Sequence, residues 1–171
     1  CLPKTAWPPT YKKSFDGLKF CFIGDGNNMA NSLIVGGLKV GMNVAVATPD
    51  GYKPDGAVLE FTKGYGDKFA LEIDPFMAAS GADILITDTW TSMGEEAEKE
   101  ERKKIFKDYQ INRQLLAAAN AGAMVQHCLP AYRGQEITEE VFEEHADEIF
   151  NEAENRLHAQ KAVMVKLMKK D

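Results

Sequence analysis

The chain has 171 residues, of which 44% are hydrophobic and 27% are charged, as expected for a globular protein with one core. Its 20 Lys and Arg residues against 26 Asp and Glu residues give a net charge of −6, which argues against nucleic acid or an anionic membrane as the main partner. No apolar run approaches the length of a membrane span, and no signal peptide is recognised. The three cysteines, Cys1, Cys21 and Cys128, form neither a disulfide framework nor a metal-binding spacing, so a reducing cytoplasm is the expected location.

Residues 1–13 contain three prolines and no periodicity, which predicts an extended arm. From Ser14 onward, short apolar runs that predict strands alternate with segments that predict helices. The predicted strands cover residues 18–23, 43–48, 69–73, 83–87 and 123–126. The first predicted helix ends near residue 39. The other predicted helices cover residues 54–63, 74–79 and 113–120 and the stretch from 155 onward. This alternation indicates an α/β fold, a Rossmann-like doubly wound parallel sheet flanked by helices in a single domain.

A highly charged segment follows Gly94, and its acids precede its bases by one helical turn. The pairs at this spacing are Glu95 with Lys99, Glu98 with Arg102, and Glu100 with Lys104. Such pairs stabilise a helix by a few tenths of a kcal/mol each. A solvated helix that packs through Ala97, Ile105 and Phe106 is therefore predicted.

The stretch from Ala82 to Gly94 carries the first candidate site. Its first half predicts a strand buried on both faces, and Asp88 follows where that strand should end. Ser92 and Met93 lie on the loop beyond it. Ligands of open α/β sheets bind at the carboxyl ends of the strands, so a carboxylate followed by this loop suits a ligand with an amine and an acid. The alternative is that Asp88 only caps the next turn.

The first strand leads into Gly24-x-Gly26, which matches two glycines of a dinucleotide-binding fingerprint. Met29 occupies the third position, where glycine allows close packing of helix and strand, and this argues against a dinucleotide site. Asn27 and Asn28 place amide groups at a helix N-terminus, where an anion is favoured or where they serve only as caps. No cofactor and no metal are expected.

The strand over 123–126 ends at His127-Cys128-Leu129-Pro130. A cysteine at this position could be a nucleophile, a proton acceptor or an inert buried thiol, and taken alone the inert thiol is favoured. Its predicted position at the same sheet edge as Asp88 and Asn28 makes Cys128 a site candidate.

Four segments together resemble the ornithine carbamoyltransferase family, in the order in which the family has them. They are Gly24-Asp25-Gly26-Asn27-Asn28, Asp88-Thr89-Trp90-Thr91-Ser92-Met93-Gly94, His127-Cys128-Leu129-Pro130 and Glu152-Ala153-Glu154-Asn155-Arg156. The resemblance implies transfer of a carbamoyl group from carbamoyl phosphate to the side-chain amine of L-ornithine, giving citrulline and phosphate. It identifies residues 14–171 as similar to the ornithine-binding domain.

The resemblance also assigns roles by position. Asn28, Asp88, Ser92 and Met93 are expected to hold the amino acid, with Asp88 on its α-amino group. Cys128 is expected beside the reacting amine, whose proton it helps to take. Leu129 would offer a carbonyl to carbamoyl phosphate, and Arg156 would reach the same substrate with its fork of donors. His127 is expected to orient its neighbours rather than act as the base.

The family has a second domain, which carries most of the phosphate contacts and which nothing in this sequence resembles. The chain is therefore expected to be one half of an enzyme, one part of a split enzyme, or a noncatalytic domain that binds amino acids or proteins. A homo-oligomer or a partner subunit is expected.

The segment from Arg156 to Lys170 predicts a helix whose apolar residues spread over more than a narrow stripe. In the resembling enzymes this helix crosses to the phosphate domain, so its outer face should be uncovered here. We expect self-association through it, or coverage by the arm through Leu2, Trp7 and Tyr11.

Overall fold

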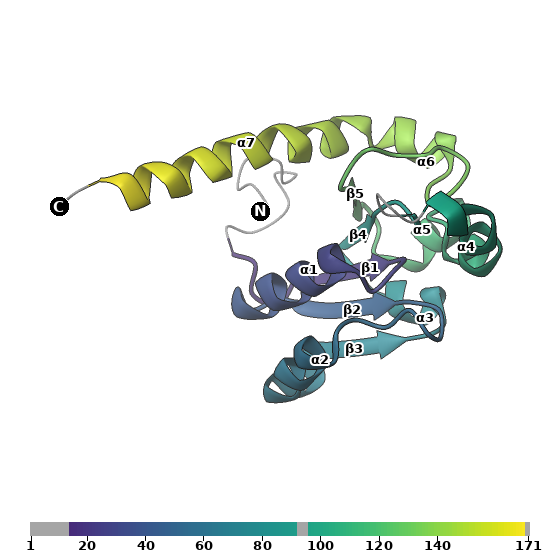
Figure 1. The fold of residues 1–171 in the computed structure, drawn as a ribbon, viewed down its shortest axis with the longest axis horizontal. Coiled ribbons are helices and arrows are strands. Elements are labelled where there is room, and N and C mark those ends of the chain that lie inside the picture. The colour runs from purple at the N-terminus through teal and green to yellow at the C-terminus, as the bar shows by residue number, and fades with distance from the viewer. Residues whose placement is uncertain (1–13, 92–95, 170–171) are drawn as a thin grey trace.

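The computed structural model describes residues 14–91 and 96–169. Over these residues the chain forms a sheet of five parallel strands in the order β3-β2-β1-β4-β5 (Figure 1). The strands are β1 (Lys19–Ile23), β2 (Asn43–Ala47), β3 (Phe69–Glu72), β4 (Ile84–Thr87) and β5 (Met124–His127). The α/β class and the doubly wound parallel sheet predicted from the sequence are confirmed. The predicted arm over residues 1–13 lies outside the described residues.

The helices follow the strands in the predicted alternation, with one addition. They are α1 (Asn28–Lys39), α2 (Gly56–Thr62), α3 (Pro75–Ala79), α4 (Lys99–Phe106), α5 (Arg113–Ala118), α6 (Glu139–Glu144) and α7 (Ala146–Met168), with three-ten helices η1 (Lys63–Lys68), η2 (Glu96–Glu98) and η3 (Lys107–Tyr109). The sequence did not reveal α6, and α7 begins nine residues before the stretch in which a final helix was predicted.

Alternate residues of each strand enter two separate cores, because successive side chains of a strand point to opposite faces. Phe20, Val44 and Ile84 pack with residues of α1 and α2 on one face. Cys21 and Leu85 pack on the other face, with residues of α3, α5, α6 and the start of α7. Burial on both faces explains why these strands are continuous apolar runs in the sequence.

The outer edge of β5 is covered by α7 rather than by another strand. The N–H of Val125 donates to Oε2 of Glu148 at 3.0 Å. Four residues further along α7, Glu152 lies near the end of β5, where burial raises its pKa and the charge of His127 opposes that rise. The Glu148 carboxylate thus satisfies one outward N–H group that would otherwise belong to an open sheet edge.

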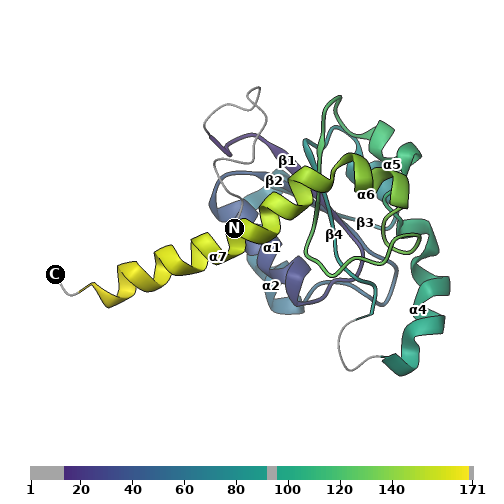
Figure 2. The same cartoon turned by 90° about the horizontal axis from the view of Figure 1, so that it is seen from above.

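The C-terminal half of α7 extends beyond the body of the domain (Figures 1 and 2). Its large apolar side chains are more than half exposed, and they are Leu157, Val163, Met164, Val165, Leu167 and Met168. Among the described residues no helix is both long and apolar enough to cross a membrane. The apolar face of this helix is uncovered among the described residues, as predicted. The arm that was predicted as one possible cover, residues 1–13, lies outside the described residues.

The charged helix differs from the prediction at two residues, Arg102 and Ala97. Arg102 was expected on a solvated face, but only 4% of its side chain is exposed. Its guanidinium pairs with Asp25 and lies 5.0 Å from the ring centre of Tyr52. Ala97, which was expected to pack inward, is exposed, whereas Phe106 is fully buried. The i, i+4 pattern reports local pairing and cannot reveal a partner 77 residues away.

Candidate functional site

Asn27 and Asn28, at the start of α1, have different roles. The side chain of Asn27 accepts the N–H of Met29 at 2.9 Å and that of Ala30 at 3.4 Å, so Asn27 is the N-cap. Asn28 is the first helical residue, and it lines a cavity at the carboxyl edge of the sheet. The capping alternative therefore applies to Asn27 and leaves the Asn28 amide available to a ligand.

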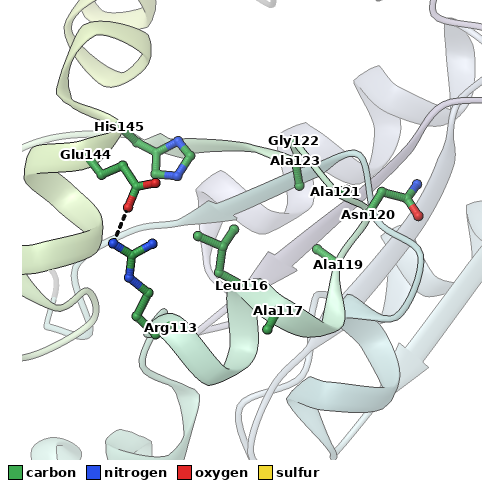
Figure 3. A pocket seen from close by; sticks show the side chains of 10 residues that line it. All are labelled: Arg113, Leu116, Ala117, Ala119, Asn120, Ala121, Gly122, Ala123, Glu144 and His145. Carbon is green, nitrogen blue, oxygen red and sulfur yellow. Dashed lines mark ion pairs between the residues drawn. The ribbon is translucent and has the colours of Figure 1, made fainter.

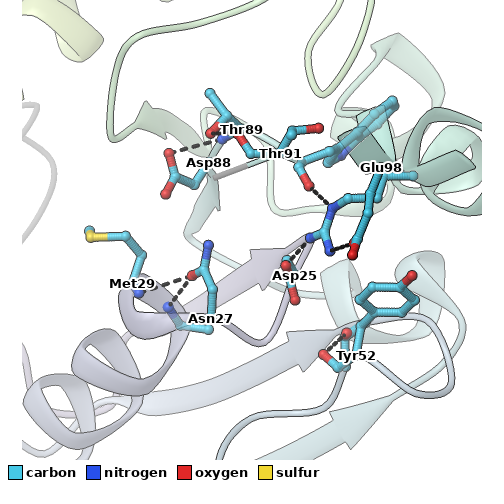
Figure 4. Close-up of polar contacts among 12 residues, drawn as sticks. Asp25, Asn27, Met29, Tyr52, Asp88, Thr89, Thr91 and Glu98 are labelled. Atoms are coloured by element: carbon cyan, nitrogen blue, oxygen red, sulfur yellow. Dashed lines mark hydrogen bonds and ion pairs between the residues drawn. The ribbon is translucent and has the colours of Figure 1, made fainter. Parts of the chain in front are cut away.

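Asp88 lies directly beyond the end of β4, and its Oδ1 accepts the N–H of Thr89 at 2.9 Å. The hydroxyl of Thr87 donates to the carbonyl of Ile23 at 2.7 Å, which ties this strand end to β1. Burial raises the pKa of Asp88, and the N–H of Thr89 opposes that shift. Figure 4 shows the Asp88 carboxyl opposite the start of α1, where Asn27 and Met29 are labelled. Asp88 thus both caps a turn and presents a carboxylate to the cavity.

The end of β5 is held by a buried His–Glu pair. Nε2 of His127 lies 2.9 Å from Oε1 of Glu136, and Nδ1 accepts the N–H of Leu129 at 2.9 Å. The same Glu136 oxygen accepts the N–H of Tyr132 at 2.6 Å. Leu129 has a φ of 48°, a left-handed conformation that is uncommon outside glycine, and the peptide bond to Pro130 is cis. Both ring nitrogens of His127 are therefore engaged in shaping this turn.

The surroundings of Cys128 favour its thiol over the thiolate. Burial is the main reason that its pKa is raised, and the nearby carboxylates of Asp88 and Glu152 raise it further. Arg156 acts in the opposite direction without reversing the shift. A thiolate is the form that would accept a proton directly, so Cys128 needs a second group if it is to do so.

These strand ends and α7 enclose one cavity of about 400 Å³. It brings together five predicted site residues, which are Asn28, Asp88, Cys128, Leu129 and Arg156. The remaining lining residues are Met29, Thr89, Trp90, Thr91, Lys99, Pro130, Tyr132 and Gln135. Ser92 and Met93, which were also predicted to hold the ligand, lie outside the described residues.

The cavity contains charges of both signs. Asp88 supplies a carboxylate, while Lys99 and Arg156 supply cations. The ammonium of Lys99 lies 5.1 Å from the ring centre of Tyr132. An amino acid carries an ammonium and a carboxylate, so a site of mixed charge with neutral amide donors is chemically suited to it.

The segment from Trp90 is anchored to α4 by Arg102. Nε of Arg102 donates to the carbonyl of Trp90 at 2.5 Å, and the same guanidinium pairs with Asp25 beyond β1. Glu98 lies 3.8 Å from the guanidinium on its outer side. Figure 4 shows the contacts of Asp25 and Glu98 with this guanidinium as dashed lines. The buried ion pair thus fixes two loops of the sheet edge relative to each other.

The glycine pair after β1 serves a packing role. The N–H of Gly26 donates to the carbonyl of Tyr52 at 2.9 Å. A Cβ at Gly26 would lie 2.4 Å from backbone atoms of Lys53 and Pro54. Only glycine permits this approach of two loops, which accounts for Gly26 without a dinucleotide.

A second cavity, of about 390 Å³, lies at the opposite end of the sheet between α5 and the start of α7 (Figure 3). Its charged groups are already paired, because Arg113 contacts Glu144 at 2.5 Å and Glu140 at 2.8 Å. His145 lies 2.9 Å from Glu148. The mixed-charge cavity is therefore the better candidate for a site.

Sequence reasoning assigned no role to two acids near the site, the buried Glu136 and the partly buried Glu152. Glu136 is fully buried beside His127, and Glu152 lies one helical turn before Arg156. The i, i+4 spacing of Glu152 and Arg156 was the available signal for the second acid. Over residues 14–91 and 96–169, no cluster of three or more His, Cys, Asp or Glu side chains is suited to a metal ion.

The sequence profile described as "Aspartate/ornithine carbamoyltransferase, Asp/Orn binding domain" matches residues 16–167. An ornithine carbamoyltransferase of Methanosarcina acetivorans is 52% identical over 159 residues, which cover 93% of this chain and 53% of that protein. One from Gloeobacter violaceus is 55% identical over 156 residues, covering 89% of this chain and 50% of the relative.

Solved structures give the same result. The ornithine carbamoyltransferase of Pyrococcus furiosus superposes with a TM-score of 0.80 and 46% identity, covering 88% of this chain and 50% of the other. The anabolic enzyme of Campylobacter jejuni has a TM-score of 0.81 and 44% identity, covering 88% and 51%. The chain spans about half the length of the curated relatives it matches.

Proposed function

Because the chain belongs to the aspartate/ornithine carbamoyltransferase family through its Asp/Orn-binding domain, we propose that residues 14–171 form the ornithine-binding half of an ornithine carbamoyltransferase. The observation that carries the proposal is the single cavity shared by Asn28, Asp88, Cys128 and Arg156. These residues come from the ends of β4 and β5 and from α1 and α7. In open parallel sheets this edge is where ligands bind.

In this proposal the amino acid lies along the cavity. Asp88 receives its α-ammonium group, and the Asn28 amide lies near its carboxylate. Ser92 and Met93, which lie outside the described residues, are assigned to the same ligand by their positions in the sequence. The reacting side-chain amine lies beside Cys128. A charge-assisted hydrogen bond of the Asp88 type contributes about 1.5–3 kcal/mol.

The chemistry requires a neutral amine, because an ammonium has no lone pair for attack. The proton must leave the amine within the site before or during bond formation. The amine nitrogen then forms a bond to the carbonyl carbon of carbamoyl phosphate, and the bond from that carbon to the phosphate oxygen breaks. Citrulline and phosphate result.

Two residues of this chain act on the second substrate. Arg156 reaches the carbamoyl phosphate and offers a fork of donors to charge that develops on its oxygens. The carbonyl of Leu129 accepts from the carbamoyl NH₂ group. A second domain, on the same polypeptide or on a partner subunit, supplies the phosphate contacts, and the active assembly is an oligomer.

Binding of L-ornithine to this chain tests the proposal. Asp88 and a few loop contacts support a dissociation constant in the millimolar range, about −4 kcal/mol. We expect calorimetry to detect this binding and Asp88→Asn to abolish it. Asp50→Asn removes an acid that forms an exposed pair with Lys53, so it serves as the matched control and should leave binding unchanged. Equal affinity of the two variants for ornithine contradicts the assignment.

The catalytic part of the proposal has its own assay. Citrulline formation from ornithine and carbamoyl phosphate is measured with the chain alone and with an added carbamoyl phosphate domain from a relative. We expect activity only in the mixture. Activity that is absent from the mixture while ornithine binding persists favours a domain that binds amino acids without catalysis.

A further inference from the structure

The lining of the mixed-charge cavity includes two cations, Lys99 and Arg156. Arg156 reaches carbamoyl phosphate in the proposed function, whereas Lys99 has no task there. Asp88, which lines the same cavity, receives the α-ammonium group of the amino acid. In an α-amino acid the carboxylate is bonded to the same carbon as that ammonium, so the two groups enter the site together. Lys99 is therefore the positive charge that is available to the carboxylate.

The ammonium of Lys99 is held at the cavity without being neutralised there. Lys103, one turn further along α4, lies 2.8 Å from Oε1 of Glu100. Among the described residues no acid pairs with Lys99 in this way, and its ammonium lies 5.1 Å from the ring centre of Tyr132. An aromatic face attracts a cation without cancelling its charge. The three N–H donors of the ammonium thus remain able to bind an anion.

Tyr132, the aromatic neighbour of Lys99, is itself anchored to the turn that carries Cys128. The backbone N–H of Tyr132 donates to Oε1 of Glu136 at 2.6 Å, and the same oxygen lies 2.9 Å from Nε2 of His127. The contact between Lys99 and Tyr132 therefore joins α4 to the segment that follows β5, and both residues line the cavity. An ammonium placed in this way loses less conformational freedom when a ligand arrives.

We propose that Lys99 binds the α-carboxylate of the amino acid and selects an amino acid over an amine, an inference that rests on the proposed function. Asp88 and Lys99 then receive the two opposite charges of one α-carbon, and the neutral Asn28 amide assists at the carboxylate. Hydrogen bonds between charged groups are about twice as strong as neutral ones, so Lys99 contributes more to this recognition than an amide does. A ligand without the carboxylate leaves the Lys99 ammonium without a counter-charge and binds more weakly.

A comparison of two ligands isolates the carboxylate. L-Ornithinamide keeps the α-ammonium and the side-chain amine of L-ornithine but has a neutral amide in place of the carboxylate. NMR titration of the full chain measures both dissociation constants in the millimolar range, at one ionic strength because salt screens these contacts. We expect the parent to prefer ornithine by about tenfold, which corresponds to 1.4 kcal/mol. Lys99→Met should bind ornithine about tenfold more weakly and ornithinamide no more weakly than the parent.

Two variants serve as matched controls. Lys99→Arg keeps the positive charge and should keep the preference for ornithine. Lys103→Met removes a cation one turn away on the same helix, where it forms a pair with Glu100, and should keep the parent ratio. The ratio of the two affinities separates recognition from stability, because a variant that only loosens α4 weakens both ligands alike.

A measurement on the parent covers the case in which a variant fails to fold. The carbon resonance of the Lys99 ε-methylene should shift when ornithine is added and should shift much less with ornithinamide. Equal shifts with the two ligands, or an unchanged preference for ornithine in Lys99→Met, overturn the role of Lys99 and leave the proposed function standing. A parent chain that does not bind ornithine overturns the proposed function and this inference with it, so the two failures are distinguishable.

Discussion

His127 and Glu136 lie 2.9 Å apart between Nε2 and Oε1, and both side chains are completely buried. Because Nδ1 of His127 accepts the N–H of Leu129, the ring proton resides on Nε2 and is donated to Glu136. Neither ring nitrogen is available to a substrate amine in this arrangement. This supports an orienting role for His127 at the turn that carries Cys128.

Glu136→Ala should destabilise the domain by about 3 kcal/mol. The substitution removes the acceptor of both the His127 ring and the Tyr132 N–H, and a buried donor without a partner costs about 1–3 kcal/mol. Urea unfolding measures the change. Glu140→Ala breaks an exposed contact with Arg113 and should cost less than about 1 kcal/mol. Equal losses in the two variants would contradict the structural role of Glu136.

Adjacent glycines of α1 should respond oppositely to alanine. A Cβ at Gly37 would lie 2.2 Å from Cε1 of Phe20 and 3.1 Å from Cγ2 of Val44, so Gly37→Ala forces the helix away from the sheet at a cost of about 1–3 kcal/mol. A Cβ at Gly36 meets nothing within 4 Å, and alanine there should stabilise the helix by about 0.5–1 kcal/mol. Thermal or urea unfolding gives both values, and the same sign for both would refute the packing argument.

Arg102→Met should destabilise the domain by about 3 kcal/mol or more. The change removes the guanidinium partner of Asp25 in a buried setting, where loss of one member of an ion pair costs about 3–5 kcal/mol. Arg102→Lys should rescue little, because an ammonium cannot bond both Asp25 and the Trp90 carbonyl in the same fork. Lys103→Met, which breaks an exposed pair with Glu100, is the control. A neutral effect of Arg102→Met in urea unfolding would exclude this anchoring role.

Glu152 should make stability fall with rising pH. Its pKa is raised from 4.5 to about 7 in the folded chain, so the folded state binds more protons than the unfolded state between these values. The contribution is complete below about pH 4.5 and is lost as the pH passes 7, by roughly 3 kcal/mol at most. Glu152→Gln should therefore gain stability relative to the parent between pH 5 and pH 8. A pH-independent difference between the two chains would contradict the raised pKa.

The uncovered half of α7 should drive self-association. Val163 and Met164 are 57% and 54% exposed, and burial of each such side chain contributes about 1.5–3 kcal/mol. Light scattering should show a mass that grows with concentration in the parent and stays monomeric in Val163→Glu and Met164→Glu. Gln160→Glu adds the same charge at an exposed polar position and should leave association intact. A parent chain that remains monomeric contradicts this prediction.

The sheet was predictable because its strands are buried on both faces and are therefore continuous apolar runs. The predicted strand at 43–48 differs from the observed Asn43–Ala47 by one residue. The six-residue helix α6 was missed because it is too short for an apolar period to show. Its local signals are the N-cap Thr138 and two acids in the first turn, Glu139 and Glu140, and such residues are common outside helices as well.

The site was predictable where its residues follow strand ends, because the carboxyl ends of parallel strands converge. Asp88 and Cys128 satisfy that rule, and the cavity includes both. Glu136 and Glu152 lie in acid-rich stretches, where a buried carboxyl looks like any solvated one. The burial of these two acids depends on β5 and the elements around it. Those elements are distant in the sequence or pack from elsewhere in the fold, so the local sequence does not show the burial.

The strand order means that strands which are neighbours in the sheet are synthesised at different times. β1 is made first yet lies at the centre, and its partner β4 is made about 60 residues later. At a synthesis rate of about 5–20 residues per second, Cys128 emerges roughly 5–20 s after Asn28. Until then β1, β2 and β3 can pair only with one another, and one edge of β1 has no neighbouring strand. The cavity is therefore completed only after β5 has brought Cys128 and α7 has brought Arg156.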